Sequence, residues 1–376
     1  MIKRNNITEL LKGVEFEWKN LDEVTNYEQP TKYLVTSTNY NDEYKTPVLT
    51  AGKTFILGYT NEIAGIYAGK NNPVIIFDDF TTANKWVNFD FKIKSSAMKI
   101  ISSADEKKYN LKYIYYWMST LPNGKIDNDH KRQWISNYAN KKIPVPPFSI
   151  QTEIVRILDK FTALTAELTA ELTAREKQYN YYRDQLLTFQ EDKVEWKALG
   201  KIVNYEQPTK YLVKSTNYSN KFKTPVLTAG KTFILGFTDE IDGIYKASET
   251  PVIIFDDFTT ANKWVDFNFK VKSSAMKMIT SIDESKYLLK YIYYWLNTLS
   301  DIRANHNHKR QWISNFANKK VPIPPLKEQA RIVEILDKFD VLTNSITEGL
   351  PREIALRQKQ YEYYRNLLLD FPKAEQ

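Results

Sequence analysis

Two kinds of hydrophobic pattern alternate along this chain. Short apolar runs such as 73–77 are bounded by Gly, Pro, Asn and Asp, which is typical of β-strands joined by turns. One stretch, 105–121, places Leu111, Ile114 and Met118 on one face and predicts a helix. Together these elements predict a compact α+β or α/β domain.

A longer, helical periodicity follows this domain. Apolar residues return mostly every three or four positions, at Ile157, Phe161, Leu164, Leu168, Leu172, Tyr179, Tyr182 and Leu186. This spacing predicts a coiled-coil seam on a rod of about 36 residues, roughly 55 Å long. A second rod repeats the pattern near the C-terminus until Gly349-Leu350-Pro351 interrupts it, and we expect Pro351 to open a continuing helix at its first position.

The chain is an internal duplication. Three segments recur 178 positions later: 26–35 as 204–213, 45–58 as 223–236, and 73–87 as 251–265. About 96 of the 136 positions in 26–161 are identical in 204–339, and this period is far longer than that of a solenoid repeat. The expected organisation is an N-terminal segment at 1–13, a globular domain at 14–147, a central helix at 148–190, a second globular domain at 191–325 and a C-terminal helix at 326–376.

The chain ends indicate a cyclic arrangement. After Leu187 the first copy continues through 194–197 into the second domain, whereas the second rod ends the chain and the matching segment, 16–19, begins it. The N-terminus thus supplies what the C-terminus lacks. We predict an α+β protein in which two α/β-type domains lie on long helices that form an antiparallel coiled coil, with an approximate two-fold axis.

The two rods differ in length. Phe161 and Tyr179 are 18 residues apart, whereas Phe339 and Tyr361 are 22 apart. The first rod holds Thr-Ala-Glu-Leu twice in succession, at 165–172, and each copy adds about 6 Å of helix. This tandem is either replication slippage tolerated on a solvated helix or, as we favour, a spacer whose length is used.

Composition and charge narrow the class of protein. The 376 residues are 42% hydrophobic, enough for folded cores, and contain no Cys, which excludes disulfides, Cys-based zinc sites and thiol nucleophiles. No apolar run is long enough for a membrane span and no apolar signal core begins the chain, so we expect a cytoplasmic protein. Of the net charge of +8, about +5 lies in 24–145 and about +6 in 202–323, with about −3 elsewhere. Two basic domains on near-neutral rods favour a polyanion bound at two places.

Motifs of nucleotide-dependent and methyl-transfer enzymes do not occur in the sequence. Gly52-Lys53-Thr54 has no upstream Gly at P-loop spacing, and there is no dinucleotide-binding or Asn/Asp-Pro-Pro-Tyr/Phe motif. The best candidates for catalytic carboxylates are two pairs that follow apolar runs: Asp78, Asp79, Asp256 and Asp257.

An autonomous metal-dependent nuclease built on these pairs is the alternative hypothesis. It would need a Glu-x-Lys partner, for which Asp90 and Lys92 are the nearest match, although Asp90 becomes Asn268 in the second copy. We favour a role for the Asp pairs in turns, and expect neither a metal site nor catalysis in this chain.

Four motifs recur in the same order in both copies: a proline-rich segment, a glutamine, an Ile-Leu-Asp-Lys-Phe stretch and a tyrosine-rich stretch. They lie at 143–147, Gln151, 154–161 and 178–183, and again at 321–325, Gln329, 332–339 and 348–365. In this order, with the duplication and the tandem spacer, the chain resembles the specificity (S) subunit of type I DNA restriction-modification systems over essentially its whole length.

The resemblance implies a division of labour. Such a subunit binds double-stranded DNA sequence-specifically through two target-recognition domains and holds two modification (M) subunits, which carry S-adenosylmethionine and methylate adenine. Restriction (R) subunits join and cleave DNA with ATP and Mg²⁺, so no cofactor is expected in this chain. Two-fold-related domains read opposite strands, and nearly identical domains predict an inverted repeat around an unread spacer.

The densest polar cluster shared by both copies is 130–134, repeated at 308–312. Arg pairs bidentately with guanine and Gln with adenine, so these segments supply candidate base readers, against the alternative of a surface turn anchored by its Trp. Loop residues of the same domains are candidate phosphate contacts, against ordinary solvated loops. The candidate DNA-binding residues are His130, Lys131, Arg132, Gln133, Lys53, Thr54, Lys85, Trp86, Lys94 and Ser95, with His308, Lys309, Arg310, Gln311, Lys231, Thr232, Lys263, Trp264, Lys272 and Ser273.

Partner contacts are expected on the rods. The candidates for packing M subunits are Tyr181, Tyr182, Tyr363 and Tyr364, with burial inside the rods as an equal alternative. The copies differ most at 41–44, 68–72 and 122–129, which we interpret as non-specific surface. A protein-binding scaffold that does not bind DNA is a third hypothesis.

Overall fold

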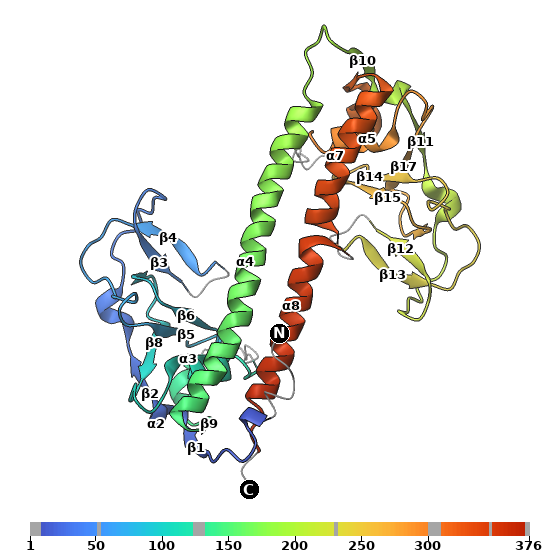
Figure 1. Cartoon of the computed structure of the whole chain (residues 1–376). Coiled ribbons are helices and arrows are strands. Elements are labelled where there is room, and N and C mark those ends of the chain that lie inside the picture. Colours follow the sequence, from blue (N-terminus) through green and yellow to red (C-terminus); the bar gives the residue numbers. More distant parts are fainter. Residues whose placement is uncertain are drawn as a thin grey trace. The chain divides into compact units, whose positions relative to one another are not determined.

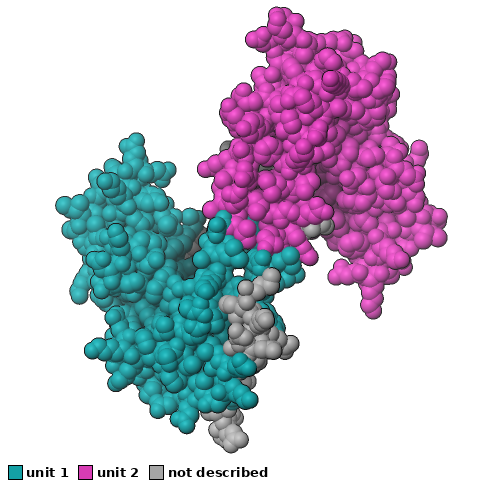
Figure 2. All heavy atoms as spheres, viewed as in Figure 1, with its two compact units in different colours: residues 1–167, 354–376 teal, residues 168–353 magenta. Residues whose placement is uncertain are grey.

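The computed structural model describes residues 9–50, 54–122, 132–228, 232–299, 310–345 and 348–372, which form two compact units (Figures 1 and 2). Unit 1 comprises residues 1–167 and 354–376, and unit 2 comprises residues 168–353. The boundary between the units falls inside two long helices, α4 (Phe148–Leu187) and α8 (Gly349–Leu368). No helix in the described ranges is both long and apolar enough to cross a membrane.

Unit 1 is a mixture of small sheets and short helices. Its strands are β1 (Glu17–Asn20), β2 (Thr25–Glu28), β3 (Thr46–Leu49), β4 (Ile56–Thr60), β5 (Val74–Asp78), β6 (Asn84–Val87), β7 (Lys92–Ile93), β8 (Met98–Ser103) and β9 (Lys142–Val145). Its short helices are α2 (Leu21–Val24), η1 (Pro30–Tyr33), α3 (Leu111–Met118) and η2 (Trp134–Tyr138). The four-stranded antiparallel sheet has the order β2-β8-β5-β6, the three-stranded sheet has the order β4-β3-β7, and β1 pairs with β9.

Unit 2 repeats this plan. Its strands are β10 (Glu195–Ala198), β11 (Val203–Glu206), β12 (Thr224–Leu227), β13 (Ile234–Thr238), β14 (Val252–Asp256), β15 (Asn262–Val265), β16 (Lys270–Val271), β17 (Met276–Ser281) and β18 (Lys320–Ile323). Its helices are η3 (Leu199–Lys201), η4 (Pro208–Tyr211), α5 (Leu289–Leu296), α6 (Gln311–Ser314), η5 (Phe316–Asn318) and α7 (Leu326–Asn344). The sheets have the orders β11-β17-β14-β15, β13-β12-β16 and β10-β18.

Strand β5 separates two cores in unit 1. All five of its residues are buried, and alternate side chains of a strand point to opposite faces. Ile75 and Phe77 therefore pack with α3 and the start of α4, whereas Val74 and Ile76 pack with the three-stranded sheet. Burial on both faces explains why residues 74–77 are all apolar instead of alternating with polar ones.

Helix α3 is shorter than the predicted helix at 105–121. It begins after Asn110, whose side-chain oxygen accepts the N–H groups of Lys112 at 3.0 Å and Tyr113 at 3.3 Å. Asparagine at this position satisfies N–H groups that have no partner inside the helix, so the helix begins there and not at Asp105.

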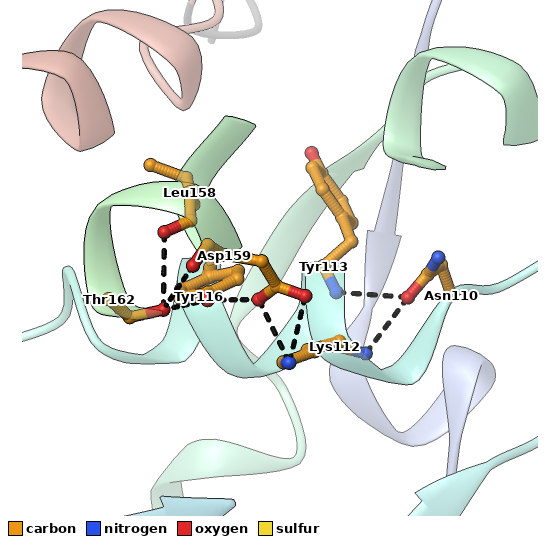
Figure 3. A network of polar contacts seen from close by, with 7 residues as sticks. All are labelled: Asn110, Lys112, Tyr113, Tyr116, Leu158, Asp159 and Thr162. Carbon is orange, nitrogen blue, oxygen red and sulfur yellow. Dashed lines mark hydrogen bonds and ion pairs between the residues drawn. The ribbon is translucent and has the colours of Figure 1, made fainter. Parts of the chain in front are cut away.

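A polar network fixes α3 on α4 (Figure 3). The Tyr116 hydroxyl donates to Asp159 Oδ1 at 2.5 Å, and Lys112 Nζ donates to Oδ2 of the same carboxylate at 2.9 Å. The buried Gln151 accepts from Asn110 N–H at 2.8 Å, and its amide donates to Lys108 O at 3.0 Å. Gln151 and Asp159 both come from the motifs that carry the family resemblance, so these motifs dock the domain on its helix.

The second rod consists of α7 and α8. The expectation that Pro351 takes the first helical position is wrong: α8 begins at Gly349, so Pro351 is its third residue. Proline is tolerated there because the first N–H groups of a helix have no acceptor within it. Gly349 has φ +72°, and a Cβ added to it would lie 2.3 Å from Val341 O, so only glycine fits the start of α8.

The chain's C-terminal segment completes unit 1. Leu368 and Phe371 belong to its core, and the Phe371 ring lies 5.0 Å from that of Phe16. The start of α4 packs with the end of α8 through Phe161 and Tyr364, whose stacked rings are 5.2 Å apart. The end of α4 packs with α7 in unit 2. The predicted α+β class, with long antiparallel helices and a cyclic chain, is confirmed.

Candidate nucleic-acid interface

Three segments meet at Asp79, and two of them carry candidate DNA-binding residues. They are the turn 79–83 between β5 and β6, the turn 94–97 before β8, and 132–134. The Asp79 N–H donates to Ala97 O at 3.0 Å, and the Asp79 C=O accepts from Gln133 N–H at 2.8 Å. Its carboxylate Oδ1 accepts from Trp134 N–H at 2.8 Å. Asp79 with these three partners is termed the Asp79 junction.

The same junction forms around Asp257 in unit 2. Its N–H donates to Ala275 O at 3.2 Å and its C=O accepts from Gln311 N–H at 2.8 Å. Its Oδ1 accepts from Trp312 N–H at 2.8 Å. In each unit, therefore, one aspartate ties the candidate base-reading segment to the C-terminal end of an interior strand of the four-stranded sheet, β5 or β14.

A buried lysine lies beside Asp79. Both side chains are fully buried, and Lys99 Nζ is 3.9 Å from Asp79 Oδ2, which is an ion pair rather than a hydrogen bond. Lys99 donates to Gln29 Oε1 at 2.7 Å and to Ser96 O. Burial lowers the pKa of Lys99, the charge of Arg132 lowers it further, and Asp79 opposes both. Lys99 and Asp79 thus form a buried ion pair, and the exposed Arg132 adds a second positive charge near it.

An aromatic pair anchors the base-reading segment. Trp134 is buried and stacks on Tyr27, with ring centroids 5.8 Å apart. Burial raises the pKa of the equivalent Tyr205 to about 12. Arg132 is exposed and Gln133 is half-buried. Trp134 therefore anchors the segment, and Arg132 is exposed to solvent two residues before it, as the sequence hypothesis requires.

The candidates on the turn 94–97 lie at this junction. Lys94 is exposed, and its Nζ is 6.0 Å from the centre of the Tyr40 ring. Ser95 Oγ accepts from Ala97 N–H at 3.1 Å and so closes the turn that reaches Asp79. Their counterparts in unit 2, Lys272 and Ser273, make the same contacts.

Lys85 and Trp86 do not share a surface. They are neighbours on β6, so their side chains point to opposite faces of the sheet. Trp86 packs against Tyr115 of α3 at 6.1 Å, and Trp264 packs against α5 in the same way, whereas Lys85 and Lys263 are exposed. Thr54 and Thr232, which lie just before β4 and β13 and not on a strand, are exposed. Lys53, His130, Lys131, Lys231, His308 and Lys309 lie outside the described residues.

Asp78 closes the turn that follows β5. Its carboxylate accepts from Phe80 N–H at 3.1 Å and from Thr81 Oγ1 at 2.5 Å. The buried Thr82 has φ +62°, a left-handed conformation that is rare for a β-branched residue. Both carboxylates of the Asp78–Asp79 pair are therefore engaged in holding backbone.

The arrangement does not support the nuclease alternative. Lys92, the lysine considered as a partner of the Asp pair, instead pairs with Glu62 at 2.8 Å and donates to Ala64 O at 2.7 Å. Asp90 accepts from the N–H of Lys70. Over the described part of the chain, no group of three His, Asp or Glu side chains could hold a metal ion.

Sequence reasoning missed Tyr27 and Lys99 as parts of this site. The one clue to Lys99 in the sequence is that it interrupts the otherwise apolar run 98–101. A charged residue in a buried strand needs a polar partner, so such a lysine indicates a partner elsewhere in the fold. Tyr27 belongs to a segment repeated without change in the second copy, but nothing in that segment indicates its partner. The junction joins residues that are far apart in sequence, and only the sheet order brings them together.

The four rod tyrosines fall into two kinds. Tyr182 stacks on Phe339 at 5.7 Å and Tyr364 stacks on Phe161, so both take part in packing between helices. Tyr181 and Tyr363 are 62% and 48% exposed. Tyr182 is also 41% exposed, so Tyr181 and Tyr363 are the pair that offers exposed surface without stacking across the helix seam.

Comparison with known proteins gives consistent results. A family model described as the type I restriction modification DNA specificity domain matches residues 13–175 and 191–356. The chain is 51% identical to the specificity subunit of a type I restriction enzyme from Escherichia coli, over 100% of this chain and 99% of that protein. It is 32% identical to a putative type I restriction enzyme specificity subunit from Haemophilus influenzae, over 98% and 99% of the two chains. The crystal structure of a type I restriction-modification S subunit from M. genitalium has a similar fold, with a TM-score of 0.68 at 15% identity over 96% of this chain and 98% of that one.

Proposed function

The chain belongs to the family of type I restriction-modification specificity subunits, and from that premise we propose that it is a non-catalytic subunit that binds double-stranded DNA through the Asp79 and Asp257 junctions. The observation that carries this proposal is the tether, by which we mean the hydrogen bond from the Trp134 or Trp312 N–H to the junction carboxylate. Each junction presents an exposed arginine and a half-buried glutamine on a segment whose next residue, a tryptophan, is buried and hydrogen-bonded. A base reader needs this combination of reach and fixed position, because a bidentate contact tolerates little displacement.

The target that follows is a bipartite inverted repeat. The two junctions have the same residues and nearly the same hydrogen-bond distances. Domains that present the same groups read the same half-site, and a two-fold arrangement reads it on opposite strands. The bases between the half-sites are not read, and the rods set their number.

The proposed partners are two M subunits and the R subunits. S-adenosylmethionine then belongs to the M subunits, and ATP with Mg²⁺ to the R subunits, while this chain holds no cofactor. Tyr181 and Tyr363 are the proposed rod contacts to M, because they are exposed aromatic residues of the kind that anchors interfaces. The proposed location is the cytoplasm, where a complex that acts on double-stranded DNA would meet its substrate.

The test is methylation mapping. The chain is expressed with its M subunit in cells that lack other adenine methylation, and methylated positions are located by long-read sequencing. We expect one bipartite motif whose half-sites are inverted copies. Two unrelated half-sites would contradict the inverted repeat, and no sequence-specific methylation would contradict the function.

Two pairs of substitutions separate base readers from phosphate contacts. Arg132→Ala with Arg310→Ala should relax or abolish the motif. Lys85→Ala with Lys263→Ala, the matched control on exposed strand lysines, should keep the motif and reduce the salt dependence of binding, by a slope of about 1 for each phosphate interaction that the substitution removes. Incubation of the purified chain with DNA and Mg²⁺ should yield no cleavage, and cleavage would favour the nuclease alternative.

A further inference from the structure

An exposed phenylalanine stands at the tip of the turn between β5 and β6 in unit 1, and its equivalent occupies the same place in unit 2. Phe80 is 44% exposed and Phe258 is 40% exposed. On either side of Phe80 the chain is buried, at Asp79 and at Thr82. Phe80 is therefore the one large apolar side chain that this turn exposes to solvent.

The backbone of this turn is held in a strained shape by several contacts. Asp78 N–H donates to Ala83 O at 2.8 Å, and Thr82 N–H donates to Asp78 O at 2.9 Å. Thr82 has φ +62°, where Gly or Asn would fit without strain. Such strain persists only where the surroundings impose it, and it is concentrated at functional sites.

The same conformation occurs in the second copy. Thr260 has φ +63°, and Asp256 accepts from Phe258 N–H at 3.0 Å and from Thr259 Oγ1 at 2.6 Å. A turn that only connects two strands usually carries a polar residue at its tip. Both units keep an aromatic one.

Phe80 also lies next to the base-reading segment. The C=O that accepts the Gln133 N–H belongs to the peptide group that joins Asp79 to Phe80. The side chains of Arg132 and Gln133 therefore emerge beside the tip of this turn. Ile135, which follows the anchored Trp134 in sequence, is a further exposed apolar residue of the segment, at 66%.

We propose that Phe80 and Phe258 make an apolar contact with the methyl group of a thymine in each half-site of the target. This inference rests on the proposed function. Arginine and glutamine read guanine and adenine in the major groove, and the thymine methyl is the apolar group that a base edge offers in that groove. Phe80 is thus a specificity-determining residue that adds an apolar contact to the polar contacts of Arg132 and Gln133.

The test compares duplexes that differ by that methyl group. Once the target is mapped, each thymine of the half-sites is replaced in turn by deoxyuridine, and binding by the complex of the full chain with M is measured. The unaltered chain should lose affinity about fourfold at one thymine position per half-site, the effect of one buried methyl group. Phe80→Ala with Phe258→Ala should bind the thymine duplex about tenfold more weakly per half-site and show no further loss with deoxyuridine.

The matched control uses exposed apolar residues elsewhere in the same domains. Ile63 and Ile241 are 90% and 84% exposed, in the loops after β4 and β13. Ile63→Ala with Ile241→Ala should bind both duplexes as the unaltered chain does. Phe80→Leu with Phe258→Leu keeps an apolar group and should retain part of the preference for thymine.

Three results would overturn the thymine contact. In the first, the Phe80→Ala pair binds the target as tightly as the unaltered chain. In the second, it loses affinity for the target and for unrelated DNA equally. In the third, deoxyuridine weakens binding of the variant as much as that of the unaltered chain. If the unaltered complex itself does not prefer its mapped target to unrelated DNA, the proposed function fails, which is a different outcome from failure of the Phe80 contact alone.

Discussion

The hydrogen bond from Trp134 N–H to the Asp79 carboxylate is the contact on which the proposed positioning of the base readers depends. Asp79→Ala with Asp257→Ala removes this acceptor in both units, whereas Asp79→Asn with Asp257→Asn keeps an oxygen in the same place and removes only the charge. The two pairs therefore separate the tether from the ion pair with Lys99, which is 3.9 Å away.

The expected changes in amide hydrogen exchange and in the free energy of unfolding follow from the burial of these groups. The Trp134 N–H is buried, and a buried donor left without an acceptor costs about 1–3 kcal/mol. The alanine pair should therefore speed hydrogen exchange at the Trp134 and Trp312 amides by roughly ten- to a hundredfold, since each 1.4 kcal/mol corresponds to a factor of ten. The asparagine pair should leave exchange at these amides close to that of the unaltered chain. Both pairs should lower the free energy of unfolding, because Lys99 loses its counter-charge in each.

DNA binding provides the functional measurement. Without the tether, Arg132 and Gln133 keep their chemistry but not their position, so the alanine pair should reduce the ratio of specific to non-specific affinity. Its salt dependence should change little, since no phosphate contact is removed. The asparagine pair should retain most of the ratio. Equal loss of specificity in both pairs, or unchanged amide exchange in the alanine pair, would refute the positioning role of the carboxylate.

Three further predictions concern acid stability, target spacing and assembly. Hydrogen bonds from Lys92 and from the 36–37 backbone lower the pKa of Glu62 to about 2. Burial acts to raise the pKa of Glu240, but hydrogen bonds from the Ser215 N–H and from Lys270 outweigh it, so this pKa is also lowered. Stability present above about pH 4.5 should therefore be lost as the pH falls toward 2, and Glu62→Gln with Glu240→Gln should flatten this part of an acid-unfolding curve followed by fluorescence. Deleting 169–172 removes about one helical turn, or about 6 Å, and should shorten the unread spacer of the methylated motif by one or two base pairs. Tyr181→Ala with Tyr363→Ala should leave thermal unfolding unchanged but weaken co-purification with M, because these side chains are exposed.

The assembly and acid-stability predictions each have a control variant, and the spacing prediction has a stated contrary outcome. Tyr182→Ala with Tyr364→Ala removes stacked rings and should lower the thermal midpoint, which the exposed pair should not do. Glu191→Gln should leave the acid-unfolding curve unchanged, since the Glu191 side chain is exposed to solvent. An unchanged spacer after the four-residue deletion would support slippage tolerated on a solvated helix.

Most of the architecture could be predicted from the sequence because it follows from long-range regularities. The duplication, the coiled-coil spacing and the placement of 16–19 at the start of the chain together require a cyclic molecule, and Phe371 indeed packs against Phe16. Local ends of helices were less predictable. Asn110 begins α3 through its side chain, and Gly349 begins α8 with a left-handed conformation, neither of which periodicity alone reveals.

The candidate interface was predicted only in part. The segment 130–134 was identified by its chemistry, but its anchoring depends on Asp79, Ala97 and Lys99, which come together through the order β2-β8-β5-β6. The pairing of Lys85 with Trp86 as joint contacts neglected the two-residue period of a strand, which places them on opposite faces.

The differences between the two copies also favour a symmetric target. In unit 1 the Lys70 N–H donates to Asp90 Oδ1 at 3.1 Å, and in unit 2 the Ser248 N–H donates to Asn268 Oδ1 at 3.2 Å. Both side chains differ between the copies while the oxygen acceptor is kept, so this loop has the same hydrogen bond in both units without the same charge. The junction, in contrast, keeps both its shape and its charged groups in the two units. Unlike half-sites would require specificity to lie in segments that differ between the copies, such as 68–72, whereas the groups suited to reading bases are the same in both units.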